Sequence, residues 1–175
     1  MTKEIGSTLQ ILEQAIRVEQ QGLDFYRRAE KRTRNAGGKA FFASLVEDEK
    51  RHEHILRGEY EKVKAGTGFV EAASAVRMEL PELTLFPKKD VLKIPPGATD
   101  LEVLQIAIDF ERRGYDMYMK AADGIADLTG KAVYQYLAKW EGHHRDLLER
   151  ALNQLSADGT WLVLDKERPL LDGGP

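Results

Sequence analysis

The sequence contains no cysteine among its 175 residues, and this absence excludes several kinds of functional site. Without thiols the chain cannot form disulfides, iron–sulfur clusters or thiolate zinc sites, and it cannot use a cysteine nucleophile. Any metal ion would therefore have to be held by carboxylates, imidazoles or water.

Long apolar runs and long basic runs are missing as well. No stretch approaches the length of a transmembrane helix, and the N-terminal stretch MTKEIGSTLQ lacks the apolar core of a signal peptide. Acidic and basic residues are mixed along the chain and the formal net charge is −3, so we expect neither nucleic acid nor a membrane as a partner. We expect a cytoplasmic protein. Its length and its apolar content of 42% suit a single domain with a real core.

What the chain does have is an internal repeat at a distance of 92 residues. Residues 9–56 match residues 101–148 without a gap, with 16 identities in 48 positions. Leucine and alanine identities can arise from helical composition alone, but matched glutamate, glycine, tyrosine and histidine residues indicate a duplicated unit. These pairs include Glu19/Glu111, Gly22/Gly114, Tyr26/Tyr118, Glu49/Glu141 and His52/His144.

Each copy is predicted to be a helical hairpin, because apolar residues recur at helical spacing through both copies. The second helices are expected over about 39–65 and 131–157. Residues typical of helix starts, breaks and stops support these bounds. They are the capping boxes Ser7–Gln10 and Thr99–Glu102, the hairpin breaks at Gly38 and Gly130, and the stops at Gly66 and Gly159.

A segment at about 67–98 separates the two copies. It contains FPKKD and IPPGATD, so it is not one long helix, although VEAASAV is expected to form a short one. The segment is long enough to cross the length of the hairpins. We therefore predict an all-α four-helix bundle with one long crossover and an internal two-fold repeat, in a single domain over 1–175. Repeat 1 covers about 7–66, repeat 2 about 99–158, and a tail 159–175, in which WLVL is expected to pack on the bundle and DGGP to fray.

Each repeat carries one Glu-x-x-His motif in its second helix. Residues three apart project from the same helix face, so each glutamate and its histidine point the same way. Each first helix adds one glutamate on its apolar stripe, where a lone carboxylate is costly to bury. Two divalent cations would balance four converging carboxylates, and the imidazoles would add neutral donors. The predicted metal ligands are Glu19, Glu49, His52, Glu111, Glu141 and His144.

Four stretches make a family resemblance specific. AIRVEQQGLDFY, LVEDEKRHEHIL, AIDFERRGYDMY and LAKWEGHHRDLL resemble the ferritin-like di-iron domain of the rubrerythrin family, and the resemblance covers nearly all of residues 8–155. It implies a ferritin-like bundle with a bridged centre of two iron ions. It also implies that Fe(II) oxidation reduces hydrogen peroxide or dioxygen, in defence against oxidative stress. A homodimer is implied too. Because the ligand set suits manganese as well, manganese stays open as the alternative metal.

Two features depart from the usual pattern of that family. The chain has no rubredoxin domain, whose iron is held by four cysteines, so it needs an external electron donor. Family members also tend to carry an extra carboxylate one turn after the third-helix glutamate, and that position here is Gly114.

Other polar and aromatic residues near the motifs have less specific roles, and the sequence singles out no catalytic residue beyond the ligands. Tyr26 and Tyr118 are predicted to pack in the core with a hydroxyl partner, with a redox role beside the metals as the alternative. His143 is expected to be an exposed bystander, or else to support the ligands by hydrogen bonding. Asp48 is expected to be surface charge, with attraction of entering cations as an alternative role, and Trp140 is expected to pack.

Two other functions remain open at this stage. The protein could load or store iron, with turnover incidental, as ferritin-like proteins do. The bundle could also be a metal-free interaction module, which predicts no stoichiometric metal.

Overall fold

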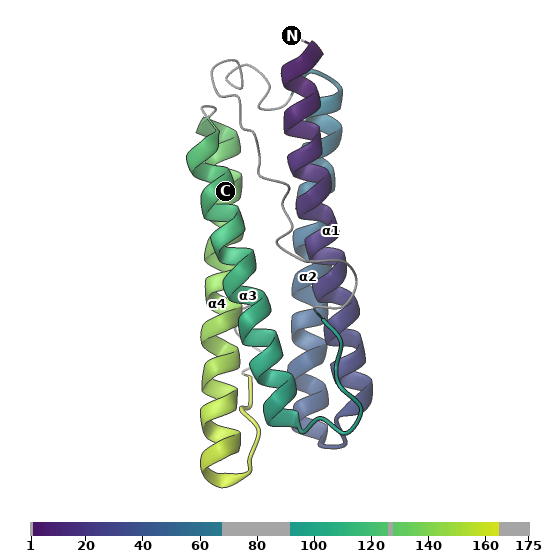
Figure 1. Cartoon of the computed structure of the whole chain (residues 1–175), viewed down its shortest axis with the longest axis vertical. Coiled ribbons are helices and arrows are strands. Elements are labelled where there is room, and N and C mark those ends of the chain that lie inside the picture. Colours follow the sequence, from purple (N-terminus) through teal and green to yellow (C-terminus); the bar gives the residue numbers. More distant parts are fainter. Residues whose placement is uncertain (1, 68–91, 126–127, 165–175) are drawn as a thin grey trace.

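The computed structural model describes residues 2–67, 92–125 and 128–164 of the chain (Figure 1). These residues form four long helices and contain no strand, which confirms the predicted all-α, ferritin-like bundle. The helices are α1 (Thr2–Arg32), α2 (Ala36–Lys64), α3 (Asp100–Gly124) and α4 (Leu128–Asp158). The short helix expected at VEAASAV, the stretch FPKKD and the C-terminal DGGP lie outside the described residues.

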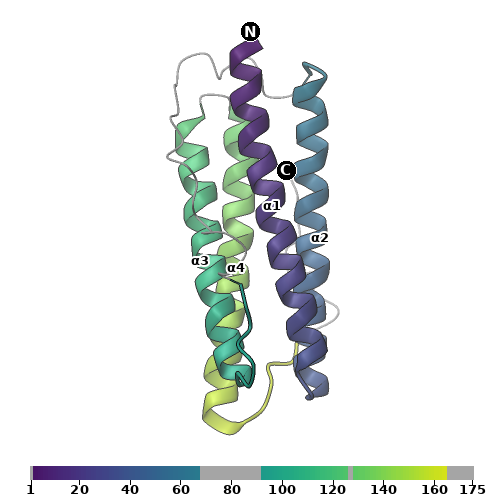
Figure 2. The ribbon, with the colours of Figure 1, turned by 45° about the vertical axis from the view of Figure 1, so that its right-hand side comes forward.

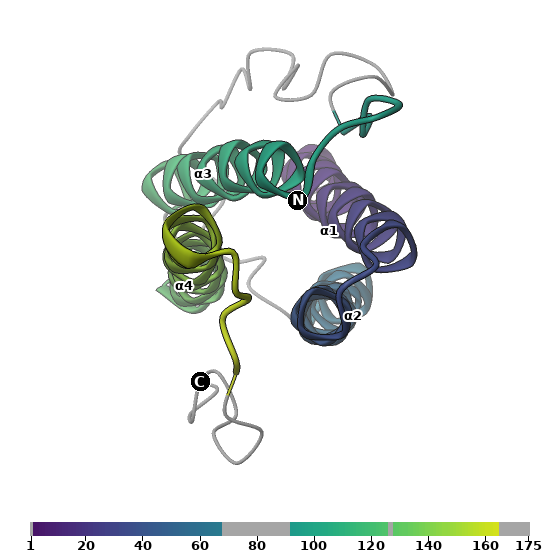
Figure 3. The same cartoon turned by 90° about the horizontal axis from the view of Figure 1, so that it is seen from below.

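The four helices form two antiparallel hairpins that lie against each other. Figures 1 and 2 show α1 beside α2 and α3 beside α4 along most of their lengths. Seen along the bundle in Figure 3, α1 and α3 lie next to each other and α2 and α4 lie on the other side. Since α2 and α3 run in the same direction, the chain has to return along the bundle between them, a distance of about 40 Å at 1.5 Å per residue. Among the described helices, none is both long enough and apolar enough to cross a lipid bilayer.

The predicted helix starts are right for α3 and wrong for α1. At α3, Thr99 Oγ1 accepts a hydrogen bond from the Glu102 amide, and the Glu102 carboxylate accepts one from the Thr99 amide, which is a complete capping box. At the first hairpin the helix already begins at Thr2, so Ser7 lies inside it and is not its N-cap. The stops are confirmed: Gly66 and Gly159 follow α2 and α4 with φ of 73° and 75°.

The predicted break at Gly38 is also displaced. Helix α2 begins at Ala36, because the Asn35 side chain caps it by accepting hydrogen bonds from the amides of Gly37 and Gly38. Gly38 therefore lies in the first turn, and the reason for glycine there is space. A Cβ on Gly38 would lie 2.6 Å from Cε2 of Trp161. Gly130 likewise lies inside α4.

The tail residue Trp161 packs against the end of the first hairpin. Its ring is 5% exposed and lies 5.7 Å from the ring of Phe41 and 5.4 Å from that of Phe42, measured between centroids. The prediction that WLVL packs on the bundle is confirmed for Trp161, Leu162 and Leu164, while Val163 is exposed.

The chain that leads into α3 is fixed to the end of α1. Arg28 donates a hydrogen bond to the carbonyl of Leu92, and Arg32 donates one to the carbonyl of Ala98. Thr33 Oγ1 also donates to the Asp100 carboxylate over 2.9 Å. These contacts set where the second hairpin begins relative to the first.

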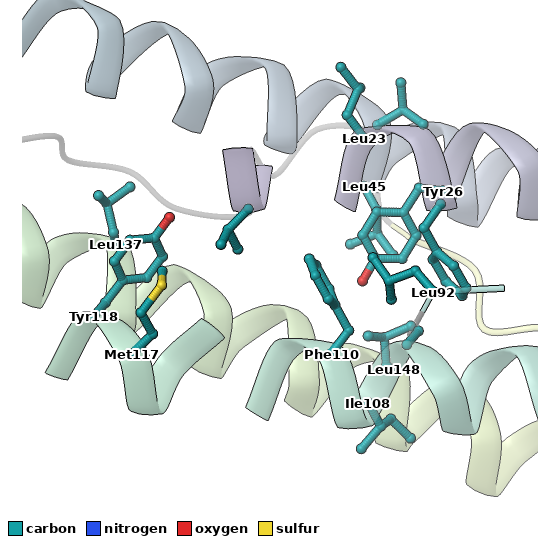
Figure 4. Packing of buried hydrophobic residues seen from close by; sticks show 14 of the residues in the cluster. Leu23, Tyr26, Leu45, Leu92, Ile108, Phe110, Met117, Tyr118, Leu137 and Leu148 are labelled. Carbon is teal, nitrogen blue, oxygen red and sulfur yellow. The ribbon is translucent and has the colours of Figure 1, made fainter. Parts of the chain in front are cut away.

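Apolar side chains from all four helices fill the interior (Figure 4). Leu12, Phe25, Leu45, Leu104 and Leu137 are fully buried. The core is interrupted by a small set of buried polar residues, and these form the site described next.

Candidate metal centre

Six buried side chains, one from each of α1 and α3 and two from each of α2 and α4, meet between the hairpins. None is more than 2% exposed. The helical period places each Glu-x-x-His pair on one face of its helix, and that face lies inward. We call this set the six-residue cluster; it consists of Glu19, Glu49, His52, Glu111, Glu141 and His144.

The cluster divides into two overlapping groups of potential ligand atoms. Glu49, Glu111, Glu141 and His144 form one group, and Glu19, His52 and Glu141 form the other. Within each group, one ligand atom per residue lies within 4.8 Å of the others. Glu141 belongs to both groups, so its carboxylate lies between two candidate ion positions.

Both imidazoles turn the same ring atom toward the carboxylates. Nδ1 of His52 lies 3.0 Å from Glu19 Oε2 and 3.7 Å from Glu49 Oε2. Nδ1 of His144 lies 3.6 Å from Glu111 Oε1 and 3.9 Å from Glu49 Oε1. Each histidine is thus closest to the single glutamate of its own hairpin, while Glu49 lies near both rings.

Several buried atoms of the cluster have no hydrogen-bond partner among the described residues. They include both carboxylate oxygens of Glu49, Oε2 of Glu111 and Nδ1 of His144. A buried polar atom without a partner costs free energy, on the order of 1–3 kcal/mol. Unpaired donor atoms of the types that bind hard or borderline cations are what a metal site requires, so the residues present fit a metal site.

Burial and mutual repulsion shift the acid–base behaviour of the cluster. Burial raises the pKa of Glu49 well above its usual value, and the negative charges of Glu19 and Glu111 raise it further. Burial likewise raises the pKa of Glu141, with Glu111 and Glu19 adding to the effect. Burial alone would also raise the pKa of Glu111, but hydrogen bonding with Glu141 and attraction to His144 lower it instead. The carboxylates therefore do not all ionise readily unless positive charge joins them.

His144 provides part of that positive charge. Burial alone would lower its pKa, but attraction to Glu111 and Asp48 and the hydrogen bond with Asp48 outweigh burial and raise the pKa to about 10. A cation that binds here would have to displace protons from the cluster.

Two tyrosines support the cluster from opposite hairpins. The Tyr26 hydroxyl on α1 donates to Glu111 on α3, and the Tyr118 hydroxyl on α3 donates to Glu19 on α1. Figure 4 shows both rings reaching across the space between the hairpins. Burial and the nearby Glu111 raise the pKa of Tyr26 well above its usual value, which keeps its hydroxyl protonated. Both residues are fully buried, so the prediction of core packing with a hydroxyl partner is confirmed, and the partners are cluster carboxylates.

Two glycines make room for the carboxylates of α2 and α4. A Cβ on Gly22 would lie 2.8 Å from Oε1 of Glu49, and a Cβ on Gly114 would lie 3.2 Å from Cδ of Glu141. The space left by the missing side chains is thus filled by the glutamates that lie between the two histidines. The extra carboxylate that the family tends to carry at position 114 would need the space that Glu141 uses.

The prediction that Asp48 is surface charge is wrong. Rather than being surface charge, it is 4% exposed, and its Oδ2 accepts a hydrogen bond from Nε2 of His144 over 3.3 Å. Trp140 packs, as predicted, with its ring perpendicular to that of His52 and 4.8 Å away between centroids. His143 lies half-buried beside His144, and burial lowers its pKa; no described hydrogen bond or ion pair joins it to the six-residue cluster.

Comparison with known proteins gives one family. No curated protein and no solved structure shows significant similarity to the chain. The family model described as Rubrerythrin matches residues 10–100, which include most of α1, all of α2 and the chain up to the first residue of α3. That match covers more than half of the sequence, and the buried carboxylate and histidine cluster fits the metal site that such a domain implies. This chain therefore belongs to the rubrerythrin family.

Proposed function

We propose that the six-residue cluster binds two iron ions and that the protein is an oxidoreductase, reducing hydrogen peroxide or dioxygen as Fe(II) is oxidised. The observation that supports this most strongly is the convergence of four buried carboxylates and two imidazoles with unpaired ligand atoms. When all four carboxylates are ionised the set needs compensating positive charge, because isolated buried charges are very costly.

The geometry supports two ions rather than one. Glu19 with His52 and Glu111 with His144 form the two outer pairs, and Glu49 and Glu141 lie between them. Four ionised carboxylates carry four negative charges, which two divalent ions balance. Oxygen donors with a minority of imidazole favour iron or manganese, and iron is the metal that the family implies.

The chemistry of peroxide reduction needs two electrons and two protons. Two bound Fe(II) ions would supply the electrons, giving two Fe(III) ions and two water molecules per hydrogen peroxide. The chain's own part is to hold the ligands: Tyr26 and Tyr118 fix the Glu111 and Glu19 carboxylates, and burial limits the access of water.

Resetting the site requires an electron donor outside this chain. With no cysteine, the chain has no rubredoxin-type iron site of its own. We propose that a separate reductant delivers electrons, and the homodimer and the cytoplasmic location remain predictions.

The proposal is tested by anaerobic Fe(II) titration of the chelator-stripped protein, followed by a pulse of hydrogen peroxide. We expect two irons per chain, rapid oxidation on the pulse, and repeated cycles when reductant is added. The Glu141→Gln variant should lose stoichiometric binding. Glu149→Gln is the matched control, because it changes an exposed glutamate of the same helix.

Other outcomes would identify the other functions. Retention of many irons per chain inside a large assembly would support iron storage. Absence of stoichiometric metal, with no effect of Glu141→Gln, would refute the di-metal proposal and leave the interaction bundle.

A further inference from the structure

The supports of the cluster are symmetric at the two tyrosines but not at the positions directly before Glu49 and Glu141. Tyr26 and Tyr118 occupy matching positions of the repeat and make matching hydrogen bonds to the glutamate of the other hairpin. The residues that directly precede Glu49 and Glu141 also match in register, yet they are Asp48 and Trp140. Each of them contacts the histidine of the other hairpin.

The two contacts differ in chemistry. Asp48 on α2 accepts a hydrogen bond from Nε2 of His144 on α4. Trp140 on α4 lies against His52 on α2 with its ring plane at 88° to the imidazole, and Nε2 of His52 has no hydrogen-bond partner among the described residues. His144 therefore contacts a carboxylate through Nε2, and His52 contacts an aromatic ring.

Asp48 is itself held in place. Its Oδ2 faces His144, while its Oδ1 lies 3.5 Å from a guanidinium nitrogen of Arg51. The same guanidinium lies 5.3 Å from the centre of the Trp140 ring, within the range of a cation–π contact. Arg51 thus contacts both residues and helps to orient the Asp48 carboxylate toward His144.

A carboxylate that is hydrogen-bonded to one ring nitrogen of a histidine changes how strongly the other ring nitrogen binds a metal. The carboxylate accepts a hydrogen bond from Nε2–H, which leaves the lone pair on Nδ1. It also fixes the ring orientation and makes Nδ1 a stronger metal ligand. In both histidines Nδ1 is the atom that faces the carboxylates of the cluster. Only His144 has a carboxylate at its Nε2 side; His52 packs against the Trp140 ring, and its Nε2 has no hydrogen-bond partner among the described residues.

We propose that the two ion positions are unequal, and that Asp48 makes the position of His144 and Glu111 the tighter one. This inference rests on the proposed di-metal function. Loss of such a support typically weakens metal binding about 10-fold to 100-fold, so we expect the two dissociation constants to differ by that factor. Asp48 is a positioning residue, because it acts through His144.

The test uses Mn(II) added to the full-length, chelator-stripped protein, with two dissociation constants measured by competition with a chromophoric chelator. Crystals loaded with one equivalent of Mn(II) show by anomalous scattering which position fills first. We expect the ion beside His144 and Glu111. The Asp48→Asn variant keeps the side-chain shape and should weaken the tighter constant about 10-fold to 100-fold, with the weaker constant unchanged. Glu47→Gln is the matched control, because it removes the exposed neighbouring charge on α2.

Several results would overturn the inference. These are two equal constants in the unaltered protein, first filling beside His52, or an Asp48→Asn variant in which both constants or neither constant changes. An equal loss in Glu47→Gln would also overturn it, because the effect would then be one of net charge. If two Mn(II) ions bind with equal affinity, the inference fails and the di-metal function stands. If no ion binds, both fail.

Discussion

Replacing Gly22 by alanine changes the stability of the protein in two opposite ways. Alanine removes the cost of a glycine inside a helix, but its side chain needs space that the cluster occupies. Alanine in the middle of a helix is favoured over glycine by about 1 kcal/mol. At Gly22, however, the new Cβ would lie 2.8 Å from Oε1 of Glu49 and 2.9 Å from Cε1 of Phe110. Overpacking of this kind costs about 1–3 kcal/mol. The net effect of Gly22→Ala is therefore a loss of stability of zero to about 2 kcal/mol.

Two other glycines serve as comparisons for Gly22, because they leave more space for a Cβ atom. At the exposed Gly58 of α2, a new Cβ would meet nothing within 4 Å, so Gly58→Ala should gain about 1 kcal/mol. At Gly114 the nearest atom, Cδ of Glu141, would lie at 3.2 Å, and a small movement of that side chain relieves the contact. Gly114→Ala should therefore fall between the other two variants in stability.

The assay is urea unfolding of the three variants and the unaltered protein, each stripped of metal, together with Mn(II) affinity. Gly22→Ala should also weaken metal binding, because Glu49 has to move. If Gly22→Ala gains as much stability as Gly58→Ala and binds metal equally well, the close approach of Glu49 to the α1 backbone is not real.

Three further predictions concern hydrogen bonding, the tail and pH. Tyr26→Phe and Tyr118→Phe each remove a hydrogen-bond donor to a buried carboxylate, and chelator competition should show that both weaken metal binding by similar factors. A hydrogen bond to a charged group contributes about 1.5–3 kcal/mol, so each factor should be on the order of 10-fold or more. A tenfold difference between the two variants would contradict the symmetric support. Trp161→Ala should destabilise the protein by about 3–5 kcal/mol by uncovering Phe41 and Phe42, with little change in metal affinity; an unchanged urea midpoint would show that the tail does not dock. The pKa of His144 is raised from 6.5 to about 10, so in the stripped protein its proton stabilises the fold below pH 6.5, and this stabilisation is lost as the pH rises toward 10. Thermal unfolding should therefore show that the melting temperature of the stripped protein falls as the pH rises over that range. The rise in melting temperature on adding Mn(II) should become larger over the same range, and a constant rise would contradict this prediction.

The repeat register explains why the cluster could be predicted from sequence. Helical spacing alone places Glu49 and His52 on one face, and the matching Glu141 and His144 indicate a second copy of that face. The buried position of Glu19 follows from its place on the apolar stripe. These inferences use only the helical period, which the structure keeps through the site.

Asp48 was missed because its surroundings come from another helix. It lies about 100° around α2 from Glu49, and at that angle the sequence does not tell solvent from a neighbouring helix. A signal was nevertheless present, because the matching position of the other repeat is Trp140, a residue that suits a buried position. The role of Gly38 was missed for a similar reason, since the Trp161 ring that needs its space is 123 positions further along the chain.

The mismatch between Asp48 and Trp140 also bears on how such a chain arises. An ancestral assembly of two identical hairpins would carry the same residue at both places, since one gene would encode both, and its two halves would be equivalent by symmetry. Once duplication and fusion put both halves in one reading frame, each could mutate separately. An aspartate facing one imidazole and a tryptophan facing the other is a difference that an assembly of two identical hairpins cannot have.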